Sequence, residues 1–323
     1  MEEYINHLNR VQRTFRIITF FTCLVCFYYL TIAIIQYKNL KALKVKGIPS
    51  LVSFAVPLLF WSCLIFACKL LYVKICAPKV QPYCKNKGCP ERAKQFADCS
   101  YRSLYNTVNS IFGLYVLSES GLLPHFLGGK TEVLSLLSNL PFEPSPSSFY
   151  AYSLFSMAYY FQDFFTTVLR NKGSNDYWEM ILHHIVTISL FAGMLFCNHV
   201  RMGVAVCFLH TVSDILLTLS RGLSHVETKI TPVVFAANLV VWMYMRNYCL
   251  VICTYRVLTY HDFADKSELF FMSQINLILG SFLAMLCIMN LYWTGLMWRL
   301  LKRAVTKGQT EDTLRQYRGR KEE

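Results

Sequence analysis

The feature that most constrains this chain is a set of long stretches without ionisable charge. Residues 17–37, 47–68 and 269–298 contain no Asp, Glu, Lys or Arg, and 180–200 has only His as a titratable polar group. Each stretch reaches the roughly 20 apolar residues that a helix needs to cross a ~30 Å hydrocarbon core. Charged residues make up only 16% of the chain, against about 25% in an ordinary soluble domain. The sequence therefore predicts a membrane protein.

Four further segments bring the expected number of spans to about eight. They are weaker because charged residues interrupt them, and they cover about 103–125, 148–169, 202–220 and 230–258. All these apolar runs are continuous rather than alternating, which favours helices over the strands of a barrel. We therefore expect an all-α, polytopic membrane helix bundle.

Basic residues predict the orientation. With eight spans, both termini lie on one side together with the connections near 69–102, 170–177 and 221–229, and that side collects 23 Lys or Arg against seven on the other. The positive-inside rule then places both termini in the cytoplasm. The first apolar run is too long for the core of a cleavable signal peptide, so we expect a signal anchor.

The 13 cysteines do not predict a disulfide framework, because most of them lie in apolar runs. Four are in the polar connection at about 74–102: Cys76, Cys84, Cys89 and Cys99. Their spacing contains no paired C-x₂-C, so reduced cysteines in a turn are favoured over a zinc site. We expect no metal.

Polar residues inside the predicted spans are the most informative. A charge at the bilayer centre costs about 2.5–3.5 kcal/mol on insertion scales. Asp163, Asp214 and Arg246 must therefore pair with another group or face a wet cavity. One alternative is an interhelical Asp–Arg pair that only holds the bundle together.

Helix geometry places several of these groups at one level. Measured from the expected cytosolic ends of their helices, His183, His184, Asp163 and Asp214 all lie about 8–9 Å deep, at 1.5 Å per residue, and His210 lies one turn deeper. Adjacent residues point about 100° apart on a helix. We therefore expect one histidine of the pair to take part in the chemistry and the other to contact a neighbouring helix.

Histidine and carboxylate without metal suit general-base or nucleophilic acyl transfer. Only His183 and His184 are clustered among the eight histidines, too few for a di-iron desaturase, and Met180 stands where a fatty-acid elongase box has His. A channel or transporter could also use buried His and Asp, but the chain shows no inverted repeat or broken helix pair.

The same residues carry a resemblance to a known family. Asp176–Thr187 (DYWEMILHHIVT), followed by Arg201-Met-Gly203 and by His210-Thr-Val-Ser-Asp214, resembles the Lag1 motif of ceramide synthases within the TLC (TRAM-LAG1-CLN8) domain. Flanking stretches at Arg92–Phe96 and Trp242–Tyr248 are also similar. Thr211 stands where many members have Asp, and Asp163 is our expected substitute.

The resemblance implies a domain layout closest to the eight-span fungal or protist type. We expect an N-terminal helix pair with a cytosolic linker at 1–90 and a basic cytosolic tail at 304–323. Between them, a TLC domain at 91–303 would place about six helices around a central cavity. The family also links the connection at Thr259–Glu268 to the choice of acyl length.

The implied reaction is transfer of a fatty acyl group from acyl-CoA to a sphingoid base, without a bound cofactor. His183, His184 and Asp214 would be catalytic. The supporting residues of the cavity would be His210, Thr211, Asp163, Thr187 and Arg246. Four basic residues near the expected cytosolic mouth could hold coenzyme A phosphates or be ordinary positive-inside charges: Arg170, Lys172, Arg221 and Lys229.

Two other classes stay open: a different TLC lipid enzyme, and a non-catalytic TRAM-like or lipid-sensing membrane protein. The expected partners are acyl-CoA, a sphingoid base and membrane lipid, with an oligomer or small accessory subunit left open and no nucleic acid. Arg320-Lys321 near the C-terminus resembles a dilysine-type retrieval signal. We therefore expect the endoplasmic reticulum membrane.

Overall fold

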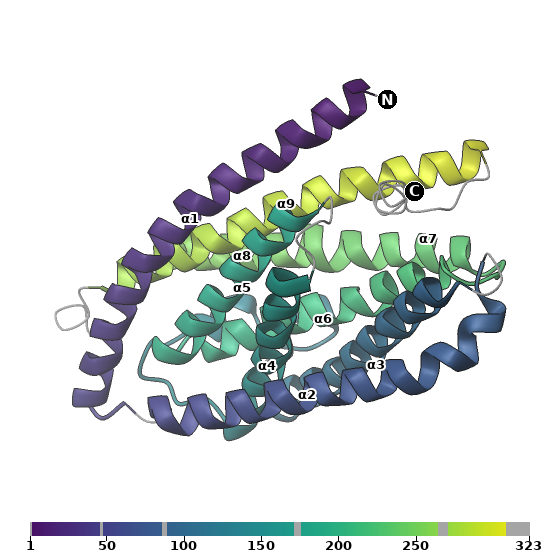
Figure 1. The fold of residues 1–323 in the computed structure, drawn as a ribbon. Helices are drawn as coiled ribbons and strands as arrows, with labels where there is room; N and C mark the ends of the chain where they lie inside the picture. The colour runs from purple at the N-terminus through teal and green to yellow at the C-terminus, as the bar shows by residue number, and fades with distance from the viewer. Residues whose placement is uncertain (1, 46–47, 86–88, 171–175, 264–270, 308–323) are drawn as a thin grey trace.

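A computed structural model describes residues 2–45, 48–85, 89–170, 176–263 and 271–307, without the side chains of 2–8, 170, 304, 305 and 307. Within these ranges the long elements are all helices and none is a strand (Figure 1). In chain order they are α1 (Glu2–Ala42), α2 (Leu51–Val80), α3 (Pro90–Glu119), α4 (Ser147–Arg170), α5 (Tyr177–Phe196), α6 (Val200–Leu223), α7 (Thr231–Trp242), α8 (Leu250–Thr259) and α9 (Met272–Lys307). A π-helical turn, Met243–Cys249, joins α7 directly to α8.

Six helical segments are long and apolar enough to cross a membrane: Asn9–Ala42, Leu51–Tyr83, Tyr177–Phe196, Val200–Leu223, Thr231–Thr259 and Met272–Arg303. The prediction of an all-α polytopic membrane bundle is confirmed. The expectation of eight spans is confirmed for these six only. The runs at 103–125 and 148–169 do form helices, α3 and α4, but neither meets the same criterion within the described residues.

Helices α3 and α4 are less apolar because they face other helices. Asn109 on α3 is fully buried, and its Nδ2 donates a 3.0 Å hydrogen bond to Ser156 Oγ on α4. Polar side chains are tolerated at membrane depth when they find such partners inside the protein. Helix α3 also ends earlier than predicted, at Glu119, because Gly121 takes a left-handed conformation (φ 68°) that stops the helix.

Helices α5 and α6 form the centre of the bundle and belong to both large apolar cores. One core packs them against α1, α8 and α9, and the other against α2, α3 and α4. Glycine allows close approach at two of these contacts. A Cβ at Gly193 of α5 would clash with Tyr29 of α1 and Leu279 of α9, and one at Gly113 of α3 would crowd Phe208 of α6.

Helices α1 and α2 flank this centre (Figure 1), and the N-terminal half of α1 contacts α5 through Gln12 and α9 through Phe15. Large apolar side chains such as Phe20, Phe27 and Val52 are exposed on their outer faces. A bilayer is the solvent that suits such faces, which agrees with the assignment of both helices as spans. The predicted catalytic residues lie on neither of them: His183 and His184 are on α5, and Asp214 is on α6.

Candidate active site

A cavity lies between α5, α6, α8 and α9, and Tyr160 of α4 also contributes to its wall. Its wall is mainly Leu, Val, Met and Phe, and three histidines interrupt it: His183, His199 and His210. An apolar pocket with a few convergent polar groups is the usual form of a ligand site. The cavity is therefore our candidate active site.

The adjacent histidines of α5 face different surroundings. His183 lines the cavity, and its ring centroid is 5.6 Å from that of Trp293 on α9. His184 is turned toward α4, where its Nε2 is 3.7 Å from Asp163 Oδ2 and 3.5 Å from Thr167 Oγ1. Adjacent residues of a helix point about 100° apart, so His183 faces the cavity while His184 contacts the neighbouring helix α4.

Asp163 is held by a chain of ion pairs that begins on α2. Arg102 of α3 binds both of its carboxylate oxygens, with Nη2 at 2.7 Å from Oδ1 and Nη1 at 2.9 Å from Oδ2. Arg102 Nε in turn lies 2.9 Å from Asp98 Oδ2, and Lys69 Nζ lies 2.8 Å from Asp98 Oδ1. Charges of alternating sign thus connect Lys69 to the imidazole of His184.

The sequence analysis missed Lys69, Asp98 and Arg102 as site residues, because it counted the two basic ones among cytosolic loop charges. The available signal was the Asp98–Arg102 spacing, since oppositely charged residues four apart on a helix pair readily. Asp98 precedes the predicted span at 103–125. Burial opposes its ionisation, but the neighbouring Arg102 and Lys69 hold the pKa of its carboxyl below the usual range.

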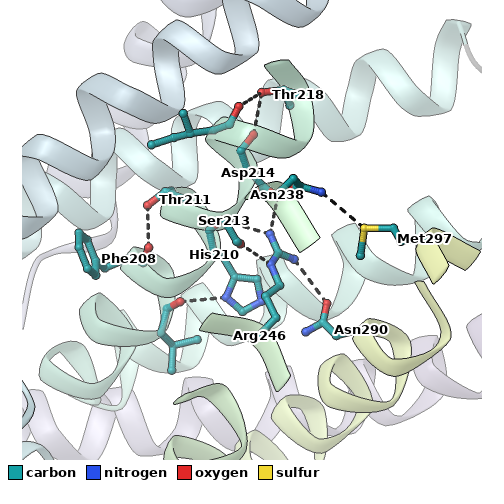
Figure 2. A network of polar contacts seen from close by, with 12 residues as sticks. Phe208, His210, Thr211, Ser213, Asp214, Thr218, Asn238, Arg246, Asn290 and Met297 are labelled. Atoms are coloured by element: carbon teal, nitrogen blue, oxygen red, sulfur yellow. Dashed lines mark hydrogen bonds and ion pairs between the residues drawn. The ribbon is translucent and has the colours of Figure 1, made fainter. Parts of the chain in front are cut away.

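Asp214 is engaged by Arg246 of the π-helical turn (Figure 2). The Nη2 of Arg246 donates to Asp214 Oδ1 at 2.5 Å and to the His210 carbonyl oxygen at 3.1 Å, while Nε donates to Ser213 Oγ at 2.6 Å. The guanidinium also stacks 4.4 Å above the Trp242 ring. A π-turn often occurs at a functional site, and here it carries the residue that ties α6 to the α7–α8 segment.

The Asp214–Arg246 contact is the interhelical Asp–Arg pair that the sequence analysis considered as an alternative. Among the described side chains, Asp214 has no hydrogen bond or ion pair with His183 or His184. The carboxylate that reaches the histidine pair is that of Asp163. A catalytic role for Asp214 stays a prediction.

The remaining supporting residues lie on α5 and α6. Thr187 lines the cavity one turn from His183, and its hydroxyl has no partner in the described part of the chain. Thr211 is buried, and its hydroxyl donates to the Phe208 carbonyl on its own helix at 3.1 Å (Figure 2). A supporting role for Thr211 stays a prediction.

Comparison with known proteins identifies the family. Residues 95–299 match the family model TRAM_LAG1_CLN8, described as the TLC domain. The chain belongs to the TLC-domain family. The predicted resemblance to its Lag1 branch is confirmed, since the similar proteins include ceramide synthases of that branch.

Three relatives of this TLC protein are each 30% identical to it over the matched residues. Sphingosine N-acyltransferase lac1 of Schizosaccharomyces pombe is 30% identical over 237 residues, 70% of this chain and 59% of the relative. Ceramide synthase LAG1 of Saccharomyces cerevisiae is 30% identical over 234 residues, 70% of this chain and 56% of the relative. Ceramide synthase hyl-2 of Caenorhabditis elegans is 30% identical over 166 residues, 50% of this chain and 48% of the relative. The chain thus spans less than two thirds of the length of these relatives.

The basic residues predicted at the mouth of the TLC cavity are only partly described. Arg221 near the end of α6 and Lys229 in the connection to α7 are exposed. The side chain of Arg170 and the whole of Lys172 lie outside the described residues. Contact of these four residues with coenzyme A stays a prediction.

Proposed function

We propose that this TLC-domain protein is an acyl-CoA-dependent N-acyltransferase that transfers a fatty acyl group to a sphingoid base and so makes ceramide. The observation that carries the proposal is the place of His183 in the wall of an otherwise apolar cavity. This histidine belongs to a motif similar to the Lag1 motif, and 30%-identical relatives are named sphingosine N-acyltransferase and ceramide synthase.

The shape and lining of the cavity suit the proposed substrates. Both are amphiphiles, and burial of each CH₂ of their tails is worth about 0.8 kcal/mol. On α5 the cavity wall runs from His183 to Met194, a rise of about 16 Å at 1.5 Å per residue. An acyl tail would lie along this length, with its carbonyl at His183 and its end toward the turn between α5 and α6.

His183 is the reacting histidine in this proposal. A neutral imidazole can take the proton of the amine or attack the thioester carbon itself. His184, whose ring centroid is 5.7 Å from that of His183, braces it from the side of α4. Asp163, whose Oδ2 lies 3.7 Å from His184 Nε2, would supply negative charge on the α4 side of the histidine pair.

The proposal extends to location and substrate entry. The protein would be resident in the endoplasmic reticulum membrane with both termini cytosolic. His183 and His184 would then lie near the cytosolic face, where acyl-CoA is available. Arg170, Lys172, Arg221 and Lys229 would bind the coenzyme A phosphates. Acyl-CoA would be a co-substrate, and no resident cofactor is proposed.

A direct assay tests the function. The purified protein in detergent or lipid nanodiscs is given acyl-CoA and sphinganine, and the N-acyl product is measured by mass spectrometry alongside His183→Ala. We expect product from the wild type and loss of it in the variant. Product from another lipid acceptor but none from sphinganine would indicate a different TLC lipid enzyme. Binding of lipid without any acyl transfer would indicate a TRAM-like or sensing protein.

A further inference from the structure

A third histidine, His210 of α6, lines the same cavity. Its Nδ1 is 2.9 Å from the Val206 carbonyl oxygen one turn earlier on the helix, and the residue is 7% exposed. A carbonyl oxygen can only accept a hydrogen bond, so Nδ1 carries the N–H. In the neutral ring, Nε2 then holds the free lone pair.

The Nε2 atom of His210 is buried and has no hydrogen-bond partner in the part of the chain that the structure describes. Native proteins rarely leave such an atom unpaired, and each case calls for a reason. His199, at the other end of the cavity, differs from it. Its two nitrogens are 3.1 Å from the Cys197 carbonyl oxygen and 3.3 Å from Asn276 Oδ1.

Arg246 holds the part of α6 that carries His210. Arg246 donates to the carbonyl oxygen of His210 at 3.1 Å and to Ser213 and Asp214 on the next turn of α6 (Figure 2). The hydrogen bond to the Val206 carbonyl oxygen fixes the tautomer of His210. The three hydrogen bonds from Arg246 hold the backbone of α6 at this residue. These contacts leave the unprotonated Nε2 of His210 without a partner on a residue that lines the same cavity as His183, within the described part of the chain.

We propose that His210 is the base that takes the proton of the sphingoid amine. This inference rests on the proposed function. Over the reaction an N–C(acyl) bond replaces the C–S bond of the thioester. The amine proton passes to Nε2 of His210 and from there to the departing coenzyme A thiolate, so the products are an amide and a free thiol. His210 would be a catalytic residue that acts on the amine, whereas His183 acts at the acyl carbonyl.

The test compares His210→Gln, which keeps polarity but not basicity, with His125→Gln as the matched control. His125 lies in an exposed connection, where its Nδ1 is near only the Gly129 carbonyl oxygen among described groups. We expect His210→Gln to lose about 10²–10⁴-fold in ceramide formation, the usual contribution of an acid–base group. Acyl-CoA binding and melting temperature should match those of the wild type, and His125→Gln should be fully active.

A rescue experiment separates a base from a structural histidine. Free imidazole should restore part of the activity of His210→Ala, or of His210→Ser if the alanine variant fails to bind acyl-CoA, and should not stimulate the wild type. An active His210→Gln would overturn the inference and leave the proposed function standing. Loss of activity without any imidazole rescue would also overturn it. A wild type that makes no ceramide would remove the proposed function and this inference together.

Discussion

Asp163 Oδ2 lies 3.7 Å from His184 Nε2, although the two residues come from different helices and neither is close to the other in sequence. The contact joins α4 to α5 beside the cavity, and Arg102 holds both oxygens of the same carboxylate. The Lag1-like motif of this chain has Thr211 where many relatives have Asp. Asp163 is the carboxylate beside His184, and its role as the substitute for the motif's aspartate stays a prediction.

Asp163→Asn should lower kcat by roughly 10–100-fold, taking as a guide the range found for carboxylates that orient metal-binding histidines. The amide keeps the size of the side chain but cannot balance Arg102 or an imidazolium. Steady-state kinetics with acyl-CoA and sphinganine measure the effect. Glu132→Gln, on an exposed connection, is the control for a change of one charge. A silent Asp163→Asn would show that this carboxylate has no part in the reaction.

His183→Ala and His184→Ala should each reduce turnover by at least about 10²-fold, as expected for an acid–base group. The structure adds a difference between them. His184→Ala also loses contacts to Asp163 and Thr167, so its melting temperature should fall, whereas that of His183→Ala should change less. Near-normal activity in both variants would remove the proposed active site.

Arg246→Lys should destabilise the protein and impair activity. A lysine cannot make the simultaneous contacts of the guanidinium to Asp214, Ser213 and the His210 carbonyl. Because lysine keeps the positive charge, the loss of stability should be smaller than the about 3–5 kcal/mol found when one partner of a buried ion pair is removed. Thermal unfolding measures the loss, with Arg256→Lys as the control because Arg256 has only a ring contact to Tyr255 among described residues.

Asp214→Asn tests the same pair from the other side. If Asp214 is catalytic, kcat should fall more than KM rises. An unchanged kcat with a lower melting temperature would assign Asp214 to bundle stability through Arg246.

Gly193→Ala should lower stability by about 1–3 kcal/mol, the typical cost of overpacking. Its methyl group would meet the Tyr29 hydroxyl of α1 and the Leu279 methyl groups of α9, so these side chains would have to shift. Gly295→Ala is the matched control, because no atom lies within 4 Å of a Cβ at that position of α9. A higher melting temperature for Gly193→Ala than for the wild type would contradict the packing of α1, α5 and α9 described above.

Exchange of Thr259–Glu268 for the loop of a relative should change the acyl length of the product and leave sphingoid-base preference intact. Val257, just before this segment, lines the cavity, and residues 259–263 are described while 264–268 are not. One buried CH₂ is worth about 0.8 kcal/mol, or roughly a fourfold change in selectivity. Product profiles from a mixture of acyl-CoAs measure the shift. An active chimaera with an unchanged profile would place the tail elsewhere.

The helices and the residues worth testing could be predicted from the amino-acid sequence. The apolar runs at 202–220 and 230–258 correspond to helical segments Val200–Leu223 and Thr231–Thr259, because length and apolarity are local properties that a bilayer reads directly. The same local pattern singled out His183, His184 and Asp214, since polar groups in such runs must have a reason.

Which of these groups contact one another depends on how the helices pack. Helical spacing predicted a common depth for Asp163, Asp214 and the histidine pair. The sequence alone could not show which of the two aspartates contacts the histidines. The rotation and crossing of packed helices distinguish them, and these depend on side chains all along the interface. They bring Asp163 to His184, turn Asp214 to Arg246, and draw Lys69 of α2 into the ion-pair chain. Partners of this kind are properties of the packed bundle and not of any one helix.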